Sequence, residues 1–288
     1  MDAVNGISGL VYETDESNFT PEEDGRFLNC YSAESILYGH QLPSNNLNMA
    51  LFLFLNNVPM RGRLESQEHI WELFRQFDRG NTTVGSQLLM EFPQLRRKSI
   101  PDLLSELILL TGTPGTLFSF NSLSVYITCT ACRENVGDTY EGPISVSYPA
   151  RNSTTELVEI LQTMFQTPQP VPAGQPQQCS ARCEDRTREF RMPVSHPILS
   201  IHVTPPSGGG GNISLPLTLN LTEIRGPLIG QESVLYRLYG FATNDMSATF
   251  RIHNDWFMSN NGTSLTWVRP FTEPVVLESV NLVLYERL

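Results

Sequence analysis

Cysteine spacing is the feature of this sequence with the most specific chemistry. Four of the five cysteines form two close pairs, Cys129/Cys132 and Cys179/Cys183, and Cys30 stands apart. A Cys-x-x-Cys turn places two thiolates at a separation that suits tetrahedral zinc, and a spacing of three residues is still compatible with shared ligation. The pairs therefore predict a four-thiolate zinc site. The alternative is that they are former metal turns, now held by packing, with reduced thiols.

Nucleophilic catalysis by a thiol is the second chemistry to consider. It needs a cysteine, a histidine base and a group that orients the imidazole. The order of residues along the chain permits a catalytic set of Cys30, His253 and Glu273. No Gly-rich turn that opens a helix stands at Cys30, so the local sequence does not support an activated thiolate there. A single histidine is more often a surface or satisfied core residue than a base. The other histidines are His40, His69, His196 and His202.

The amino-acid composition argues against a nucleic-acid-binding protein and against a membrane-spanning protein. The 288 residues include 19 Lys+Arg and 30 Asp+Glu, for a formal net charge of −11, and 40% are hydrophobic. Arg96-Arg97-Lys98 is the only basic cluster, so direct nucleic-acid binding by this chain is not expected. No apolar run is long enough for a membrane span, and residues 1–18 are acidic without an apolar signal segment. We therefore expect a cytoplasmic protein, with the nucleus as an alternative location, and we discount the six Asn-x-Ser/Thr sequons.

Hydrophobic periodicity predicts the elements that must position these residues. Residues 1–35 read as an acidic irregular leader, and the apolar segment 47–55 reads as a buried helix preceded by an N-cap at Ser44 or Asn45. The other expected helices are 66–77, 100–110 and 154–166. The expected strands are 123–129, 144–148, 198–203, 215–222, 234–243, 248–257, 264–268 and 281–286. Helices followed by a run of strands predict an α+β fold.

Three segments together resemble the ubiquitin-specific proteases (USPs). They are the helix Asn45–Leu53 with Pro59-Met60-Arg61, the two cysteine turns followed by His196-Pro-Ile-Leu-Ser-Ile-His, and Tyr236-Arg-Leu-Tyr-Gly-Phe with Trp267 and Val283-Leu-Tyr-Glu-Arg287. The resemblance implies a papain-type hand with a helical thumb, a β palm and zinc-finger-type fingers. Residues 36–288 would be one domain, with the thumb at 36–122, the fingers at 123–195 and the palm at 196–288, including a Gly-rich loop at 205–211.

The catalytic positions depart from that family. Asn45 falls where the resemblance places the nucleophilic cysteine, Phe52 falls on the family's glutamine, and Ile252-His253-Asn254 stands at the Gly-His-Tyr of the His-box. After Trp267 the acid position reads Pro270-Phe271-Thr272-Glu273, without an aspartate. A rival placement puts Cys30-Tyr31 on the family's Cys-Tyr but leaves the 45–61 helix unexplained. We prefer Asn45, which implies that protease chemistry is lost.

A narrower resemblance is to the inactive USP-like domain in the nuclease-bearing subunit of the poly(A) nuclease (PAN) deadenylation complex. The similar segments are Phe27 to Asn48, Ile144-Ser-Val-Ser-Tyr-Pro149 and Pro197-Ile-Leu-Ser-Ile201. This resemblance implies a non-catalytic scaffold in mRNA deadenylation, whose partners are complex subunits or ubiquitin. The alternatives are an active deubiquitinase that uses Cys30 and His253, and a ubiquitin-binding pseudoenzyme outside RNA decay.

Overall fold

The computed structural model describes helices and strands in two compact units. The described residues are 45–55, 72–73, 76, 84–96, 98–110, 124–129, 131–133, 135–138, 144–148, 154–170, 186–191, 197–205, 211–225, 234–243, 247–252, 255–260 and 264–288. Unit 1 comprises Met1–Leu117, Tyr239–Thr272 and Ser279–Val283, and unit 2 comprises the remaining residues, Phe118–Leu238, Glu273–Glu278 and Leu284–Leu288. Strands β10 (Leu235–Thr243) and β15 (Val280–Arg287) contribute residues to both units.

The helices of unit 1 surround an apolar centre. Those whose bounds the structure describes are α2 (Asn45–Leu55), α5 (Val84–Glu91), the 3₁₀ turn η4 (Pro93–Leu95) and α6 (Ile100–Leu110). The predicted helices at 47–55 and 100–110 are confirmed, and α5 was not predicted. Of the predicted helix 66–77 the structure describes only residues 72, 73 and 76, which are helical.

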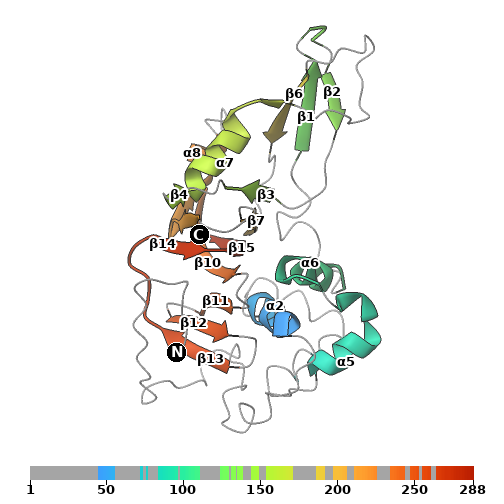
Figure 1. The fold of residues 1–288 in the computed structure, drawn as a ribbon, viewed down its shortest axis with the longest axis vertical. Coiled ribbons are helices and arrows are strands. Elements are labelled where there is room, and N and C mark those ends of the chain that lie inside the picture. Colours follow the sequence, from blue (N-terminus) through green and yellow to red (C-terminus); the bar gives the residue numbers. More distant parts are fainter. Residues whose placement is uncertain are drawn as a thin grey trace. The chain divides into compact units, whose positions relative to one another are not determined.

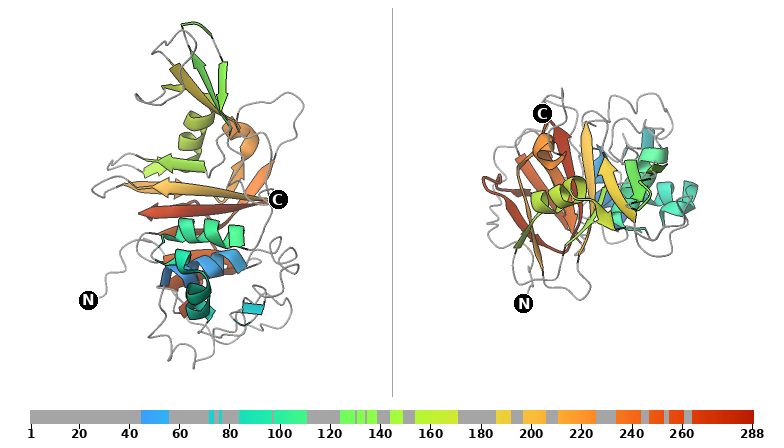
Figure 2. Two further views of the ribbon diagram at one scale, coloured as in Figure 1. Left: turned by 90° about the vertical axis from the view of Figure 1, so that its right-hand side faces the viewer. Right: turned by 90° about the horizontal axis from the view of Figure 1, so that it is seen from above.

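An antiparallel sheet forms the other layer of unit 1. Its strands lie in the order β13 (Ser264–Val268), β12 (Asp255–Asn260), β11 (Ser247–Ile252) and β10. Helix α2 contacts both α6 and β11. It lies between α6 and the strands β11 to β13 in Figure 1, and beside α6 in the left view of Figure 2. The prediction of one strand over 248–257 is wrong, because Ile252 pairs with Asp255 and the segment is a hairpin of β11 and β12.

Both faces of this sheet are covered within unit 1. A Cβ on Gly240 would lie 2.8 Å from the carbonyl oxygen of Thr249 and 3.1 Å from Cδ2 of Leu53, so glycine permits α2 to lie close to β10. The next residue, Phe241, points to the opposite face. There the Trp256 and Phe271 rings meet edge to face at 4.8 Å between centroids, and Phe241 lies 6.5 Å from Trp256. Burial on both faces explains the nearly continuous apolar run of β10.

Unit 2 contains a four-stranded sheet in the order β2, β1, β6 and β5. Its strands are β1 (Ser124–Cys129), β2 (Asn135–Asp138), β5 (Gln169–Pro170) and β6 (Arg186–Arg191). β1 pairs antiparallel with both β2 and β6. The strand predicted at 123–129 is therefore confirmed, whereas the polar strands β2 and β6 were not predicted.

The rest of unit 2 is also built largely from strands. β3 (Ile144–Ser147) runs parallel to β7 (Ile198–Thr204), and β8 (Asn212–Leu215) lies between β14 (Val275–Glu278) and β4 (Thr154–Glu156). Strand β9 (Thr218–Asn220) pairs with Leu235–Arg237 of β10, and two helices complete the unit, α7 (Leu157–Gln166) and α8 (Leu221–Arg225). The fold is thus mixed α+β with sheets dominating, in agreement with the predicted class.

Two sequence predictions in unit 2 need correction. Residues 154–156 belong to a strand rather than to the start of a helix, because they pair with β8. The prediction of one strand over 215–222 is wrong, because β8 ends at Leu215, β9 covers only Thr218–Asn220, and Leu221–Arg225 form the helix α8. The Asn220 side chain caps α8 by accepting the N–H of Thr222 at 3.0 Å and donating to Glu223 Oε1 at 3.0 Å. Across the described helices, none combines the length and the apolar character needed to cross a membrane.

Candidate functional site

Helix α2 begins at Asn45, the residue that stands at the expected position of a nucleophile. The next residue, Asn46, donates a hydrogen bond from Nδ2 to the carbonyl oxygen of Lys98, 3.2 Å away, just before α6. Asn48 is 3% exposed, and its Oδ1 would lie 3.2 Å from a Cβ placed on Gly85 of α5. The start of α2 is therefore hydrogen-bonded to the segment before α6 and lies close to α5 at Gly85.

The remainder of α2 is a core element. Its described apolar side chains are fully buried: Leu47, Met49, Ala50, Leu51, Leu53 and Phe54. At its last turn, Tyr239 OH donates to the carbonyl oxygen of Leu53 at 3.2 Å. Carbonyl groups in the final turn of a helix have no partner within the helix, so this bond satisfies one of them. The helix is held at both ends, as a helix that positions a chemical group must be.

The other predicted catalytic positions are only partly described. Cys30 and His253 lie outside the described residues. The strand ends on either side of residues 253–254 are described, and they are the paired residues Ile252 and Asp255. Glu273 is exposed and belongs to unit 2, whereas Asn45 belongs to unit 1. The carboxylate that the structure places beside Trp267 is that of Asp255, whose Oδ1 accepts the indole N–H at 3.4 Å. Sequence reasoning missed this contact, because the two residues are neighbours only through the pairing of β12 with β13.

The Cys129-Thr-Ala-Cys132 turn has a conformation that is compatible with zinc ligation. Cys129 ends β1 and is buried, and Cys132 is exposed, and neither forms a disulfide. The backbone N–H of Cys132 donates to Cys129 Sγ at 3.4 Å, and that of Arg133 donates to the Cys129 carbonyl oxygen at 2.9 Å. Arg133 has a left-handed φ of 58° that closes the turn. An N–H donor directed at a cysteine sulfur is compatible with zinc ligation, so the chemistry of this cysteine pair fits the predicted zinc ion.

The second cysteine pair lies outside the described residues. Cys179 and Cys183 therefore have no described position relative to Cys129 and Cys132. Within the described part of the chain, no group of three or more His, Cys, Asp or Glu side chains could hold a metal ion. The four-thiolate site stays a prediction.

Comparison with known proteins identifies the fold. No family model matches the chain. No curated protein matches it either. A chain of the SAGA Ubp8/Sgf11/Sus1/Sgf73 DUB module bound to ubiquitin aldehyde matches with a TM-score of 0.62 and 12% identity, over 86% of this chain and 68% of that chain.

Two further solved structures give the same result. The yeast SAGA DUB module with a variant Sgf73 matches with a TM-score of 0.61 and 13% identity, over 87% of this chain and 69% of that chain. The module with a variant Ubp8 bound to monoubiquitin matches with a TM-score of 0.60 and 12% identity, over 96% of this chain and 72% of that chain. At such identities the likeness concerns the fold alone. The chain therefore has a fold like that of the ubiquitin-specific proteases.

Proposed function

We propose that this chain is a non-catalytic USP-like domain that acts as a protein-interaction scaffold. The observation that carries the proposal is the start of α2 at Asn45 in a chain with a USP-like fold. Isopeptide hydrolysis by a thiol protease needs a thiolate beside an imidazole. An asparagine amide can cap a helix but cannot attack a carbonyl carbon, so a domain with Asn45 at that position retains the scaffold without the nucleophile.

Protein partners are the class of ligand that the comparisons favour. The matched structures are multi-subunit complexes, and two of them also contain ubiquitin. The resemblance to the inactive USP-like domain of the PAN complex supports subunits of a deadenylation complex as partners and mRNA decay as the process. We place the protein in the cytoplasm, with the nucleus as the alternative.

Activity measurements test the loss of protease chemistry. We expect the wild-type protein not to hydrolyse ubiquitin-AMC at micromolar concentration, and not to form an adduct with a ubiquitin-propargyl probe. Asn45→Cys should not restore turnover, because no aspartate stands after Trp267 at the position that would orient the imidazole. The proposal fails if the wild-type protein cleaves di-ubiquitin and Cys30→Ala or His253→Ala abolishes the cleavage.

Ubiquitin binding without catalysis is the second candidate function. It is favoured by the two matched structures that contain ubiquitin aldehyde and monoubiquitin. Calorimetric titration with monoubiquitin separates the two candidates, since a deadenylation scaffold is expected to give no saturable heat. Capture of deadenylation subunits by the full chain would favour the scaffold, and their absence from the captured proteins would count against it.

We also propose that Cys129, Cys132, Cys179 and Cys183 bind one structural zinc ion. Support comes from the spacing of the pairs and from the N–H donor directed at the sulfur of Cys129. The ion would hold two segments of unit 2 together, and metal binding would then contribute to the stability of that unit.

A further inference from the structure

The short connection between η4 and α6 carries a motif that the proposed function does not use. Residues 96–99 read Arg96-Arg97-Lys98-Ser99, so three basic residues directly precede a serine. These are three of only 19 basic residues in a chain with a net charge of −11. The cluster is too small for a nucleic-acid surface.

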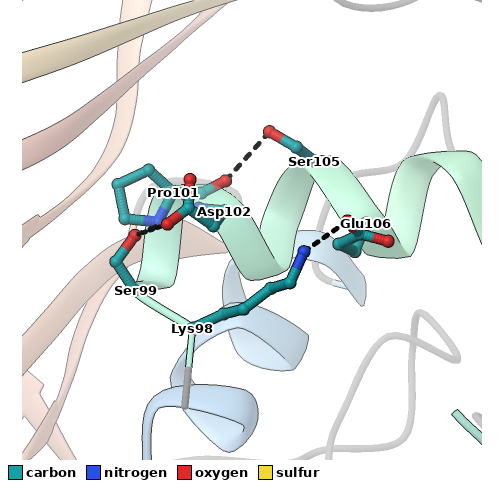
Figure 3. A network of polar contacts seen from close by, with 6 residues as sticks. All are labelled: Lys98, Ser99, Pro101, Asp102, Ser105 and Glu106. Atoms are coloured by element: carbon teal, nitrogen blue, oxygen red, sulfur yellow. Dashed lines mark hydrogen bonds and ion pairs between the residues drawn. The ribbon is translucent and has the colours of Figure 1, made fainter. Parts of the chain in front are cut away.

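Ser99 presents its hydroxyl group to solvent at the start of α6. The residue is exposed, and Oγ donates to Asp102 Oδ2 at 2.6 Å while accepting the N–H of Asp102 at 3.3 Å (Figure 3). Both contacts are exposed. The Ser99 carbonyl oxygen accepts the first bond of the helix, from the N–H of Leu103 at 2.9 Å. Ser99 is thus an N-cap residue whose reactive oxygen is accessible.

The structure describes two of the three basic residues before Ser99, Arg96 and Lys98. Arg96 is exposed and its backbone is extended, with φ −68° and ψ 138°. Lys98 pairs with Glu106 of α6, and its side chain is 30% exposed. In the sequence, arginines stand three and two residues before the acceptor. This charge pattern matches the acidic groove of a basophilic serine kinase, which selects substrates by their basic residues.

We propose that Ser99 is a phosphorylation site for a basophilic serine kinase. In the reaction, Ser99 Oγ attacks the γ-phosphorus of ATP, and a new O–P bond forms as the bond to the β,γ-bridging oxygen breaks. ADP leaves, and the hydroxyl proton passes to the catalytic aspartate of the kinase. Ile100 is buried, so the kinase would engage the chain from the N-terminal side of Ser99, where the basic residues lie. The transfer would require local opening of the first turn of α6.

Phosphorylation would change the contacts around the start of α6. The phosphate brings about −1.5 to −2 charges at neutral pH, and Ser99 then has no proton to donate to Asp102. The phosphate repels the Asp102 carboxylate and competes with Glu106 for the Lys98 ammonium group. Asn46 at the start of α2 donates to the Lys98 carbonyl oxygen, so the modified segment is hydrogen-bonded to the helix that begins at Asn45.

Phosphorylation of the full chain in vitro tests the proposal. The probe is the catalytic subunit of cyclic-AMP-dependent protein kinase with ATP, and tandem mass spectrometry locates the phosphate. We expect one phosphoryl group on Ser99 of the wild-type protein. Arg96→Ala keeps the acceptor and its cap, and it should lower kcat/KM of the kinase reaction by about tenfold or more. Arg269→Ala removes another exposed arginine of unit 1 and should leave the rate unchanged.

Several results would overturn the proposal. They are an unmodified wild-type protein, a phosphate mapped to another residue, or an Arg96→Ala variant phosphorylated as fast as the Arg269→Ala control. Ser99→Ala should abolish labelling, but it also removes a helix cap, so its circular dichroism must match the wild type. The mapped site on the wild-type chain decides the question independently of that variant.

Discussion

The phenolic oxygen of Tyr239 in β10 lies 3.2 Å from the carbonyl oxygen of Leu53 in the last turn of α2, and it donates a hydrogen bond to it. The two residues are 186 positions apart in the chain. The bond joins the buried helix α2 to the sheet. Tyr239 is followed by Gly240, where β10 lies close to the Leu53 side chain of α2.

Tyr239→Phe should destabilise the protein by about 1–3 kcal/mol, because the Leu53 carbonyl group stays buried and loses its donor. Urea unfolding followed by circular dichroism measures the change. Tyr239→Leu removes the ring as well as the hydroxyl group and should cost more. Equal stability of Tyr239→Phe and the wild type would mean that the bond contributes nothing.

Leu51→Ala should cost about 2–5 kcal/mol, because the Leu51 side chain is fully buried and its truncation leaves a cavity at the centre of unit 1. Chemical denaturation gives the value. Leu109→Ala is the matched control, because Leu109 in α6 is 70% exposed and its loss should change stability by less than about 0.5 kcal/mol. Similar costs for the two variants would contradict the central position of α2.

Tyr285 should make the protein sensitive to alkaline pH. Burial raises the pKa of Tyr285 well above its ordinary value of 10.0, and the hydroxyl group donates to the Pro216 carbonyl oxygen at 3.0 Å. Above that ordinary value the unfolded chain loses the proton while the folded chain retains it, so the unfolded state binds fewer protons and stability falls as the pH rises. The contribution is complete below pH 10 and is lost progressively towards the folded pKa.

Tyr285→Phe tests this linkage. Unfolding free energies measured at about pH 8 and about pH 11 should differ less for the variant than for the wild-type protein. The variant should also be less stable than the wild type at the lower pH, since the Pro216 carbonyl oxygen loses its donor. A pH dependence identical to that of the wild type would exclude Tyr285 as its source.

Protein purified without chelators should contain one zinc ion per chain, measured by atomic emission. Cys132→Ser should lower the zinc content, because it removes one of four thiolates, and Cys30→Ser should leave it unchanged because Cys30 belongs to neither pair. Chelation should lower the thermal stability of unit 2. Zinc-free protein, or a structure with the two pairs more than about 6 Å apart, would favour cysteines held by packing alone.

Local patterns in the sequence determined the elements that bury a continuous apolar surface. The run Leu47–Leu55 predicted α2, because a helix without a polar face has to be buried. The spacing of apolar residues over Ile100–Leu110 predicted α6, which buries one face and exposes Asp102 and Leu109. Alternation of β-branched and polar residues predicted β1. A local signal for α8 was also present, since Asn220 precedes Glu223 by three residues in a capping pattern that the strand interpretation overlooked.

Only the tertiary structure decided where short or polar segments pair. Thr154-Thr155-Glu156 becomes a strand because β8 lies beside it, and the polar strand β6 forms because β1 supplies its hydrogen-bonding partner. The site depended on the fold in the same way. The resemblance of the 45–53 segment to a known motif was enough to place Asn45 at the start of a helix. The hydrogen bonds that hold this helix join distant segments: Asn46 and Lys98 are 52 residues apart, and Tyr239 and Leu53 are 186 residues apart. No local pattern encodes such contacts, because they form only when the packing of helix on sheet brings the two backbones together.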